Sequence, residues 1–181
     1  MTTEMIATAE GSFRERLSAW WADRAPKARK RLPYAVIGLL MVWTFSQHFA
    51  LAWVVTESVG ATMALVQKGV PPHKGDLFVF AYSGPELGNH RKGEVFVKYL
   101  AGVPGDKVER EGRNFSIDGK ALGTAKTHSL GGIPLEASQP GVIPPGYVYA
   151  FAPHKDALDS RYAVLGLVPQ SAVIGRAIKL W

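Results

Sequence analysis

The distribution of hydrophobic and polar residues divides the chain into three parts. Residues 1–33 mix charged, polar and apolar side chains, whereas residues 34–55 form an apolar stretch without a formal charge. From residue 56 onward, short runs rich in Val, Phe, Tyr and Ile are separated by Gly and Pro, a pattern typical of β-strands joined by turns. The pattern therefore predicts a polar leader over 1–33, a helix over 34–55 and a mainly β domain over 56–181.

Within the β domain, alternation and composition predict six strands, over residues 77–82, 95–100, 107–110, 114–117, 147–151 and 172–178. Asp118 and Gly119 lie between two apolar runs, and an Asp-Gly pair in that position is a strong signal for a tight hairpin turn. Residues 123–146 are rich in Gly, Pro and Ser, so we expect a long loop or insertion there.

The apolar stretch 34–55 is long enough to cross a bilayer as a helix. At 1.5 Å per residue it would extend about 33 Å, compared with a hydrocarbon core of about 30 Å. A basic cluster precedes it, formed by Arg24, Lys27, Arg29, Lys30 and Arg31. Because basic flanks stay in the cytoplasm, residues 1–33 are expected there and the rest of the chain is expected to be exported. The sequence therefore predicts a single-pass membrane protein with membrane lipid as a partner.

Two other interpretations of this region are possible. A cleavable signal peptide would use the small residues Ala50 and Ala52, but the apolar stretch and the basic leader are both long for such a segment. Nucleic-acid binding by the basic cluster is the second interpretation. The position of the cluster beside an apolar stretch already explains it, and anionic lipid is the nearer partner, so we expect no nucleic acid.

Composition limits the chemistry that this chain of 181 residues can perform. The net charge is +6 and there is no cysteine, which excludes disulfides, zinc–thiolate sites and cysteine nucleophiles. The five histidines show no spacing typical of metal ligands. We therefore expect neither a metal nor a cofactor.

Lys98 is the strongest candidate for a reactive side chain. Period-two alternation places it on the same strand face as Phe96 and Leu100. An ammonium group beside apolar side chains loses hydration, which favours the neutral amine, and a neutral amine can act as a base. The other interpretation is a structural lysine whose long side chain reaches water.

Four stretches follow one another in a recognisable order: TESVGAT at 56–62, GDLFVF at 75–80, VKYLAGVPGDKV at 97–108 and DSRY at 159–162. Together they resemble the type I signal peptidase family, which are membrane-tethered serine proteases with a Ser–Lys dyad. The resemblance covers about residues 34–181. It implies an antiparallel β domain with one N-terminal transmembrane helix. It also implies a place in the bacterial inner membrane, with the N-terminus in the cytoplasm and the catalytic domain in the periplasm.

The resemblance assigns roles to five residues. Ser58 matches the nucleophile and Lys98 the general base. Thr56 matches a hydroxyl position that helps to bind the oxyanion, together with the backbone N–H of Ser58. Asp159 and Arg161 match a pair of structural charges near the site. The roles are chemically coherent, because a serine hydroxyl is a poor nucleophile until a base removes its proton.

Within the family, the single anchor, the short core and the C-terminal residues 174–181 are similar to conjugative-transfer peptidases, which process pilin precursors. The expected function is therefore cleavage of exported precursors by a membrane-anchored serine endopeptidase. A pilin is the expected substrate, and components of a conjugation or secretion machinery are possible partners.

Three departures from the family pattern favour a second hypothesis, a catalytically inactive scaffold in a conjugation or secretion assembly. Residues 58–62 lack the usual methionine and proline, and residues 151–154 replace a Gly-Asp-Asn run. Ala157 stands where many members have a serine that orients the lysine. Ser160 is not expected to substitute for that serine, because alternation turns it away from the face of Ala157. A plain binding module would be favoured if Lys98 were exposed and far from Ser58.

Overall fold

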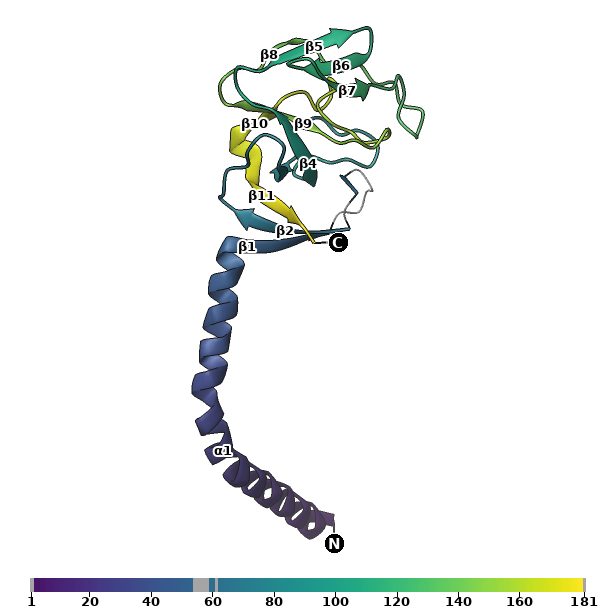
Figure 1. Cartoon of the computed structure of the whole chain (residues 1–181). Helices are drawn as coiled ribbons and strands as arrows, with labels where there is room; N and C mark the ends of the chain where they lie inside the picture. The colour runs from purple at the N-terminus through teal and green to yellow at the C-terminus, as the bar shows by residue number, and fades with distance from the viewer. Residues whose placement is uncertain (1, 54–58, 61, 181) are drawn as a thin grey trace. The chain divides into compact units, whose positions relative to one another are not determined.

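The computed structural model describes residues 2–53, 59–60 and 62–180 of the chain. The chain divides into two compact units, Met1–Ser46 and Gln47–Trp181. The first unit holds helix α1 (Thr2–His48) as far as Ser46. The second unit holds the last two residues of α1 and the β domain, whose first strand is β1 (Phe49–Trp53) (Figure 1). The prediction of a mainly β, antiparallel domain is confirmed.

The apolar part of α1 presents its side chains to the surroundings. From residue 28 to residue 48 every side chain is exposed, including Leu39, Met41 and Val42. Among the described residues, no helix combines the length and the apolar character that crossing a membrane requires. The predicted transmembrane helix is therefore not confirmed.

The helix predicted over residues 34–55 is also wrong in its C-terminal part, because α1 ends at His48 and Phe49–Trp53 form β1. The residues of β1 alternate between large and small side chains. Ala50 and Ala52 pack against the core, while Leu51 and Trp53 are exposed. Pairing with strand β2 (Met63–Lys68) also satisfies the backbone of β1. Tertiary pairing thus overrides the apolar composition that suggested a continuous helix.

The larger sheet has seven strands in the order β1-β2-β11-β3-β4-β9-β10, and each neighbouring pair is antiparallel. Its other members are β3 (Leu77–Ala81), β4 (Val95–Gly102), β9 (Tyr147–Phe151), β10 (Val168–Pro169) and β11 (Val173–Lys179), with a 3-10 turn at Gln170–Ala172. β4 therefore lies inside the sheet, between β3 and β9, and both of its edges are paired.

The smaller sheet has four strands in the order β7-β6-β5-β8: β5 (Lys107–Glu111), β6 (Asn114–Ile117), β7 (Lys120–Thr124) and β8 (Gly141–Val142). It forms one end of the β domain, and β1 and β2 lie at the opposite end (Figure 1). The predicted hairpin joins β6 to β7 and is confirmed. Asp118 and Gly119 both have positive φ, of 48° and 78°, as a type I′ turn requires.

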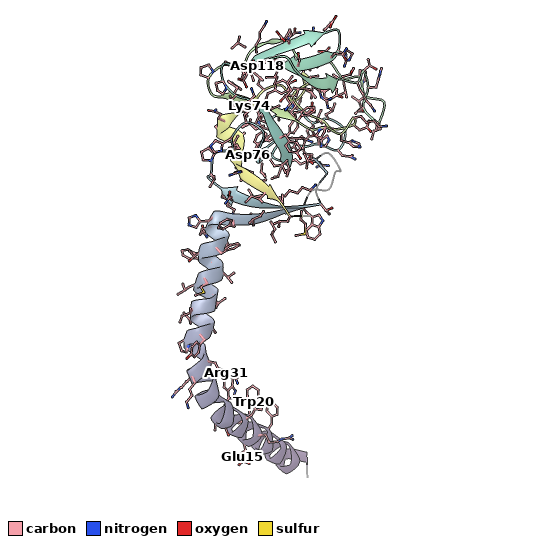
Figure 2. All side chains as sticks on the ribbon, viewed as in Figure 1. Glu15, Trp20, Arg31, Lys74, Asp76 and Asp118 are labelled. Atoms are coloured by element: carbon pink, nitrogen blue, oxygen red, sulfur yellow. The ribbon has the colours of Figure 1, made fainter. Side chains whose placement is uncertain are left out.

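The two sheets meet at the end of β4. A Cβ on Gly102 would lie 2.5 Å from Cδ1 of Ile143 and 2.9 Å from Cδ1 of Ile117, so only glycine allows this approach. Lys74, in the turn before β3, reaches across to the smaller sheet, with its Nζ 3.0 Å from Asp118 and 2.7 Å from Asp106 (Figure 2). These ion pairs are partly exposed and contribute little energy each, so close packing is the main contact between the sheets.

All six predicted strands occur, with ends that differ from the prediction by two residues at most. Sequence patterns did not reveal β1, β2, β8 and β10. Strands β8 and β10 have two residues each, too few for alternation to be visible. The predicted loop 123–146 holds the end of β7 and all of β8.

Candidate active site

Lys98 lies in the interior of the larger sheet. It belongs to β4, stands opposite Phe78 of β3 and has only 5% of its surface exposed. Its Nζ is 5.6 Å from the ring centroid of Phe96. Among the described residues, none forms a hydrogen bond with this amine. An ammonium group in such surroundings loses most of its hydration, which penalises the charged form.

The loss of hydration makes the ammonium group of Lys98 a stronger acid than that of an exposed lysine. Burial lowers the pKa of Lys98 from 10.5 to about 8, while the charge of Asp159 raises it and the charge of Arg161 lowers it. The effects of the two nearby charges on the pKa of Lys98 thus oppose each other, and desolvation remains the main cause of the lowered pKa. With a pKa of about 8, about a tenth of the molecules carry the neutral amine at pH 7.

Asp159 and Arg161 form a buried ion pair, with 0% and 3% of their surfaces exposed. Nε of Arg161 lies 2.9 Å from Oδ1 of Asp159, and Nη2 lies 2.8 Å from Oδ2, so the contact is bidentate. The carboxylate also accepts the backbone N–H of Ala152 at 3.1 Å, and Nη2 donates to the carbonyl of Ala152 at 3.2 Å. Such complete hydrogen bonding is what allows an ion pair to remain buried.

The backbone fixes this ion pair next to β4. Ala152 follows directly after β9, whose last residue, Phe151, pairs with Tyr99 of β4. Ser160 adds two more links to β9: its N–H donates to the carbonyl of Ala150, and its Oγ accepts the N–H of Ala150, both at 2.9 Å. The side chain of Ser160 is therefore occupied in attaching its segment to β9.

Ser58 and Thr56, the expected nucleophile and oxyanion donor, lie outside the described residues. The neighbouring residue Val59 is described and is 3% exposed. Its carbonyl accepts a hydrogen bond from the hydroxyl of Tyr99 at 3.4 Å. Val59 also belongs to the same buried cluster as Val97. Val59 is thus hydrogen-bonded to Tyr99 and shares a buried cluster with Val97, the two residues that flank Lys98 in β4 and alternate with it in direction.

Sequence reasoning missed Tyr99 as a contact of the Val59 segment. No motif marks it, because an aromatic residue in a strand is ordinary. Its position directly after Lys98 was the only available signal.

Ala157 belongs to the same cluster as Val59 and Val97 and is buried. Its methyl group can neither donate nor accept a hydrogen bond, so it cannot orient Lys98 in the way that a serine hydroxyl could. In the part of the chain that the structure describes, no group of three or more His, Asp or Glu side chains is placed to hold a metal ion.

Comparison with known proteins agrees with the resemblance in sequence. The sequence model of the family described as "Signal peptidase, peptidase S26" matches residues 29–181. Among solved structures, a signal peptidase I from Enterococcus faecalis V583 is 25% identical. The match covers 59% of this chain and 96% of that chain, with a TM-score of 0.40. None of the curated proteins that were compared with the chain matches it. The family match extends over most of the chain, including β4 and the segment of Asp159, and the chain therefore belongs to the signal peptidase family, peptidase S26, whose members are serine peptidases of the signal-peptidase type.

Proposed function

We propose that this protein is a membrane-anchored serine endopeptidase that cleaves exported precursor proteins, with Ser58 as nucleophile and Lys98 as general base. The observation that supports this most is the burial of Lys98, which lowers the pKa of its amine to about 8. A buried lysine without a hydrogen-bonded acid among the described residues costs stability. Such a cost is expected where a neutral amine is needed for the reaction.

The reaction begins with the neutral amine of Lys98. Nζ takes the proton of the Ser58 hydroxyl while Oγ attacks the scissile carbonyl carbon, and the carbonyl oxygen becomes an oxyanion. The backbone N–H of Ser58 and the hydroxyl of Thr56 are the proposed oxyanion donors, and each well-placed donor contributes about 3–4 kcal/mol. Collapse of the tetrahedral intermediate breaks the C–N bond, and the ammonium of Lys98 returns the proton to the leaving amine.

The acyl-enzyme is then resolved by water. Lys98, neutral again, takes a proton from the attacking water molecule. As the second tetrahedral intermediate collapses, the bond between the carbonyl carbon and Oγ of Ser58 breaks, the ammonium of Lys98 returns the proton to Oγ, and the new carboxyl end of the substrate is released. In this scheme Asp159 and Arg161 are positioning residues. Their paired charges hold the segment beside β4 and leave the pKa of Lys98 governed mainly by burial.

We include in the proposal a place for the protein in the bacterial inner membrane. The apolar residues of α1 from 34 to 48 are exposed, and Arg29, Lys30 and Arg31 precede them. An exposed apolar surface of this kind is stabilised by an apolar environment such as lipid. The basic residues before it favour a cytoplasmic position for the N-terminal end of the helix. The β domain would then lie in the periplasm, where exported precursors emerge.

The proposed substrate is a pilin precursor of a conjugative transfer system, and components of that system are the proposed partners. This part of the proposal is supported by the similarity of residues 174–181, and of the single-anchor organisation, to conjugative-transfer peptidases. The family match supports a precursor that carries a signal peptide.

The experiment that tests the proposal compares the full-length protein with Ser58→Ala and Lys98→Ala in detergent, using pilin precursors and mass spectrometry of the products. Both variants should lose processing while they remain folded, because each removes one half of the proton transfer. Ser171→Ala and Lys92→Ala, at exposed positions, are the matched controls and should process normally. Full activity in either dyad variant would overturn the proposed mechanism.

One observation favours the second hypothesis, a scaffold without activity: Ala157 supplies no hydroxyl to orient Lys98. A scaffold would process no precursor at any pH, and the wild-type protein in the same assay distinguishes the two hypotheses.

A further inference from the structure

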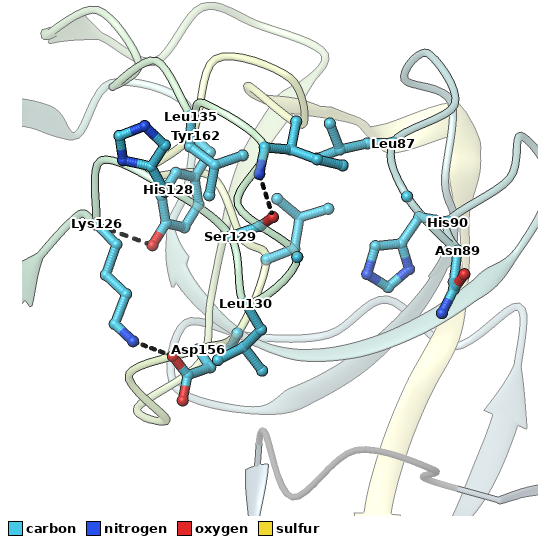
Figure 3. Close-up of a pocket in the computed structure, with 15 residues that line it drawn as sticks. Leu87, Asn89, His90, Lys126, His128, Ser129, Leu130, Leu135, Asp156 and Tyr162 are labelled. Carbon is cyan, nitrogen blue, oxygen red and sulfur yellow. Dashed lines mark hydrogen bonds and ion pairs between the residues drawn. The ribbon is translucent and has the colours of Figure 1, made fainter.

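A pocket of about 350 Å³ lies beside the segment that leads to Asp159, and its size is in the range of sites that bind small ligands. Three parts of the chain line it: the turn 87–90, the loop 126–135 and residues 156–158 with Tyr162 (Figure 3). The loop belongs to the region 123–146 that lies between β7 and β9. The insertion, whose role the sequence does not explain, thus supplies more of the lining than either of the other two parts.

Hydrogen bonds hold the walls of the pocket in place. The loop closes on itself, since the N–H of Ser129 donates to the carbonyl of Ile133 at 2.8 Å, and Oγ of Ser129 accepts the N–H of Ile133 at 3.1 Å. The backbone N–H of Lys126 donates to the hydroxyl of Tyr162 at 3.1 Å (Figure 3). The N–H of Ala163 donates to the carbonyl of Glu136 at 2.9 Å. The loop is therefore attached to the same segment that carries Asp159 and Arg161, and the pocket is preformed.

The side chains that line the pocket favour an uncharged ligand. Leu135, Ala157 and Tyr162 are buried and form apolar walls. The charged side chains of Lys126 and Asp156 form an ion pair with each other, so their charges are already compensated. Leu130, also in the lining, is 85% exposed at the turn of the loop. This side chain gains most if an apolar group covers it.

The pocket shares Ala157 with a buried cluster of the β domain, and Ala157 and Leu158 in its lining lead directly to Asp159, whose charge acts on Lys98. The cluster also contains Val59 and Val97. Those two residues directly follow Ser58 and precede Lys98 in the chain. This shared segment is the reason to expect that a polypeptide bound at Lys98 places a nearby side chain in the pocket.

We propose that this pocket binds a large apolar side chain of the polypeptide substrate, close to the scissile bond, and so determines part of the sequence specificity. The inference rests on the proposed function, because it takes the reaction centre at Ser58 and Lys98 as the reference point for the substrate. The inference adds a determinant of substrate specificity, which the loop 126–135 helps to form.

The test uses the full-length protein in detergent and synthetic peptides that span the cleavage region of a pilin precursor. Leu, Phe, Ala or Asp is placed in turn at each position on both sides of the cleavage site, and kcat/KM is measured for each peptide. For the wild-type protein we expect one position at which Leu or Phe is preferred over Ala by about tenfold or more, a ratio typical of apolar pockets. Asp at that position should be the poorest choice.

Two variants change the pocket at exposed positions, where folding is not at risk. Asn89→Trp places a bulky ring at its mouth, and Leu130→Asp removes apolar surface and adds a charge. Both should bring the Leu-to-Ala ratio at that position close to one. The matched controls Glu86→Trp and Val142→Asp change exposed residues outside the lining and should keep the wild-type ratio. The absence of any position with an apolar preference, or a preference unchanged in both pocket variants, would overturn the inference.

If the proposed function itself is wrong, the same experiment gives a different result. If the wild-type protein cleaves no peptide, the function is wrong, and the pocket is then tested by binding alone, from the fluorescence anisotropy of a labelled Leu-containing peptide. Binding that weakens in both pocket variants and not in the controls would support the pocket. Binding that is equal in all five proteins, or no binding at all, would contradict it.

Discussion

Burial both lowers the pKa of Lys98 and makes this residue costly to the stability of the fold. The side chain is 5% exposed and lies near Phe96 and Phe78, so the charged form has little solvation. Sequence alternation was sufficient to place Lys98 on an apolar face. It could not show how far Asp159 and Arg161 oppose each other at the amine, because that balance depends on the distances between side chains from two separate segments.

The first consequence concerns stability. The folded pKa of Lys98 is about 8 and the ordinary value is 10.5, so between these values the unfolded chain binds more protons than the folded one. Stability should therefore rise from pH 8 to pH 10.5, and below pH 8 the folded protein bears the full penalty, on the order of 3 kcal/mol. Lys98→Met should remove the penalty and stabilise the protein at pH 7 by up to this amount, while it abolishes activity.

Thermal and urea unfolding of the full-length protein in detergent, at pH 7 and at pH 10.5, measures this difference. The advantage of the Met variant should shrink at pH 10.5, where the wild-type amine is neutral in the folded protein and half neutral in the unfolded chain, so that most of the penalty is gone. Lys92→Met, at an exposed position, is the control and should show no such change. A Lys98→Met variant with the same advantage at both pH values would disprove the linkage.

The segment after β9 is the element that sets the electrostatics around Lys98. Its ion pair is bound to Ala152, and its backbone is bound to β9 through Ser160. The motif in the sequence identified Asp159 and Arg161 as neighbours of the site. The attachment to β9 was not visible in the sequence, because it uses backbone groups that every residue possesses.

The two members of the ion pair should shift the pH dependence of cleavage in opposite directions. Arg161 lowers the pKa of Lys98 and Asp159 raises it. Arg161→Met should therefore move the rise in kcat/KM to higher pH, and Asp159→Asn should move it to lower pH. Each change also leaves a buried partner unpaired, which costs about 3–5 kcal/mol, so the profiles are measured at low temperature on protein shown to be folded. Shifts in the same direction would show that the two residues act only through stability.

Prediction of the elements was most successful where a pattern is local. The hairpin at Asp118 and Gly119 followed from two residues, and β4 followed from a short apolar run rich in Val, Phe and Tyr. β1 was missed because no charged residue separates it from the helical part of the apolar stretch, so composition alone gives no boundary near residue 49. Its strand structure depends on pairing with β2, which sequence patterns also failed to show.

For the whole molecule, the proposed reaction centre draws on three segments that are distant in sequence. Val59 is the neighbour of the proposed nucleophile, β4 carries Lys98, and the segment from Ala157 to Arg161 supplies a member of the Val59 cluster and the ion pair. Family motifs could identify these segments in advance, because each carries its own short signature. The pocket beside them could not be predicted, because the loop 126–135 takes its shape from hydrogen bonds to residues 162 and 163.

The central claim is that the neutral amine of Lys98 performs the proton transfer, and the pH dependence of kcat/KM for precursor cleavage tests it most directly. Below pH 8 the neutral fraction of an amine with a pKa of about 8 increases about tenfold per pH unit. The wild-type rate should therefore rise with that slope and level off above pH 8. A profile that is flat across this range, or that is already level near pH 6, would contradict the account.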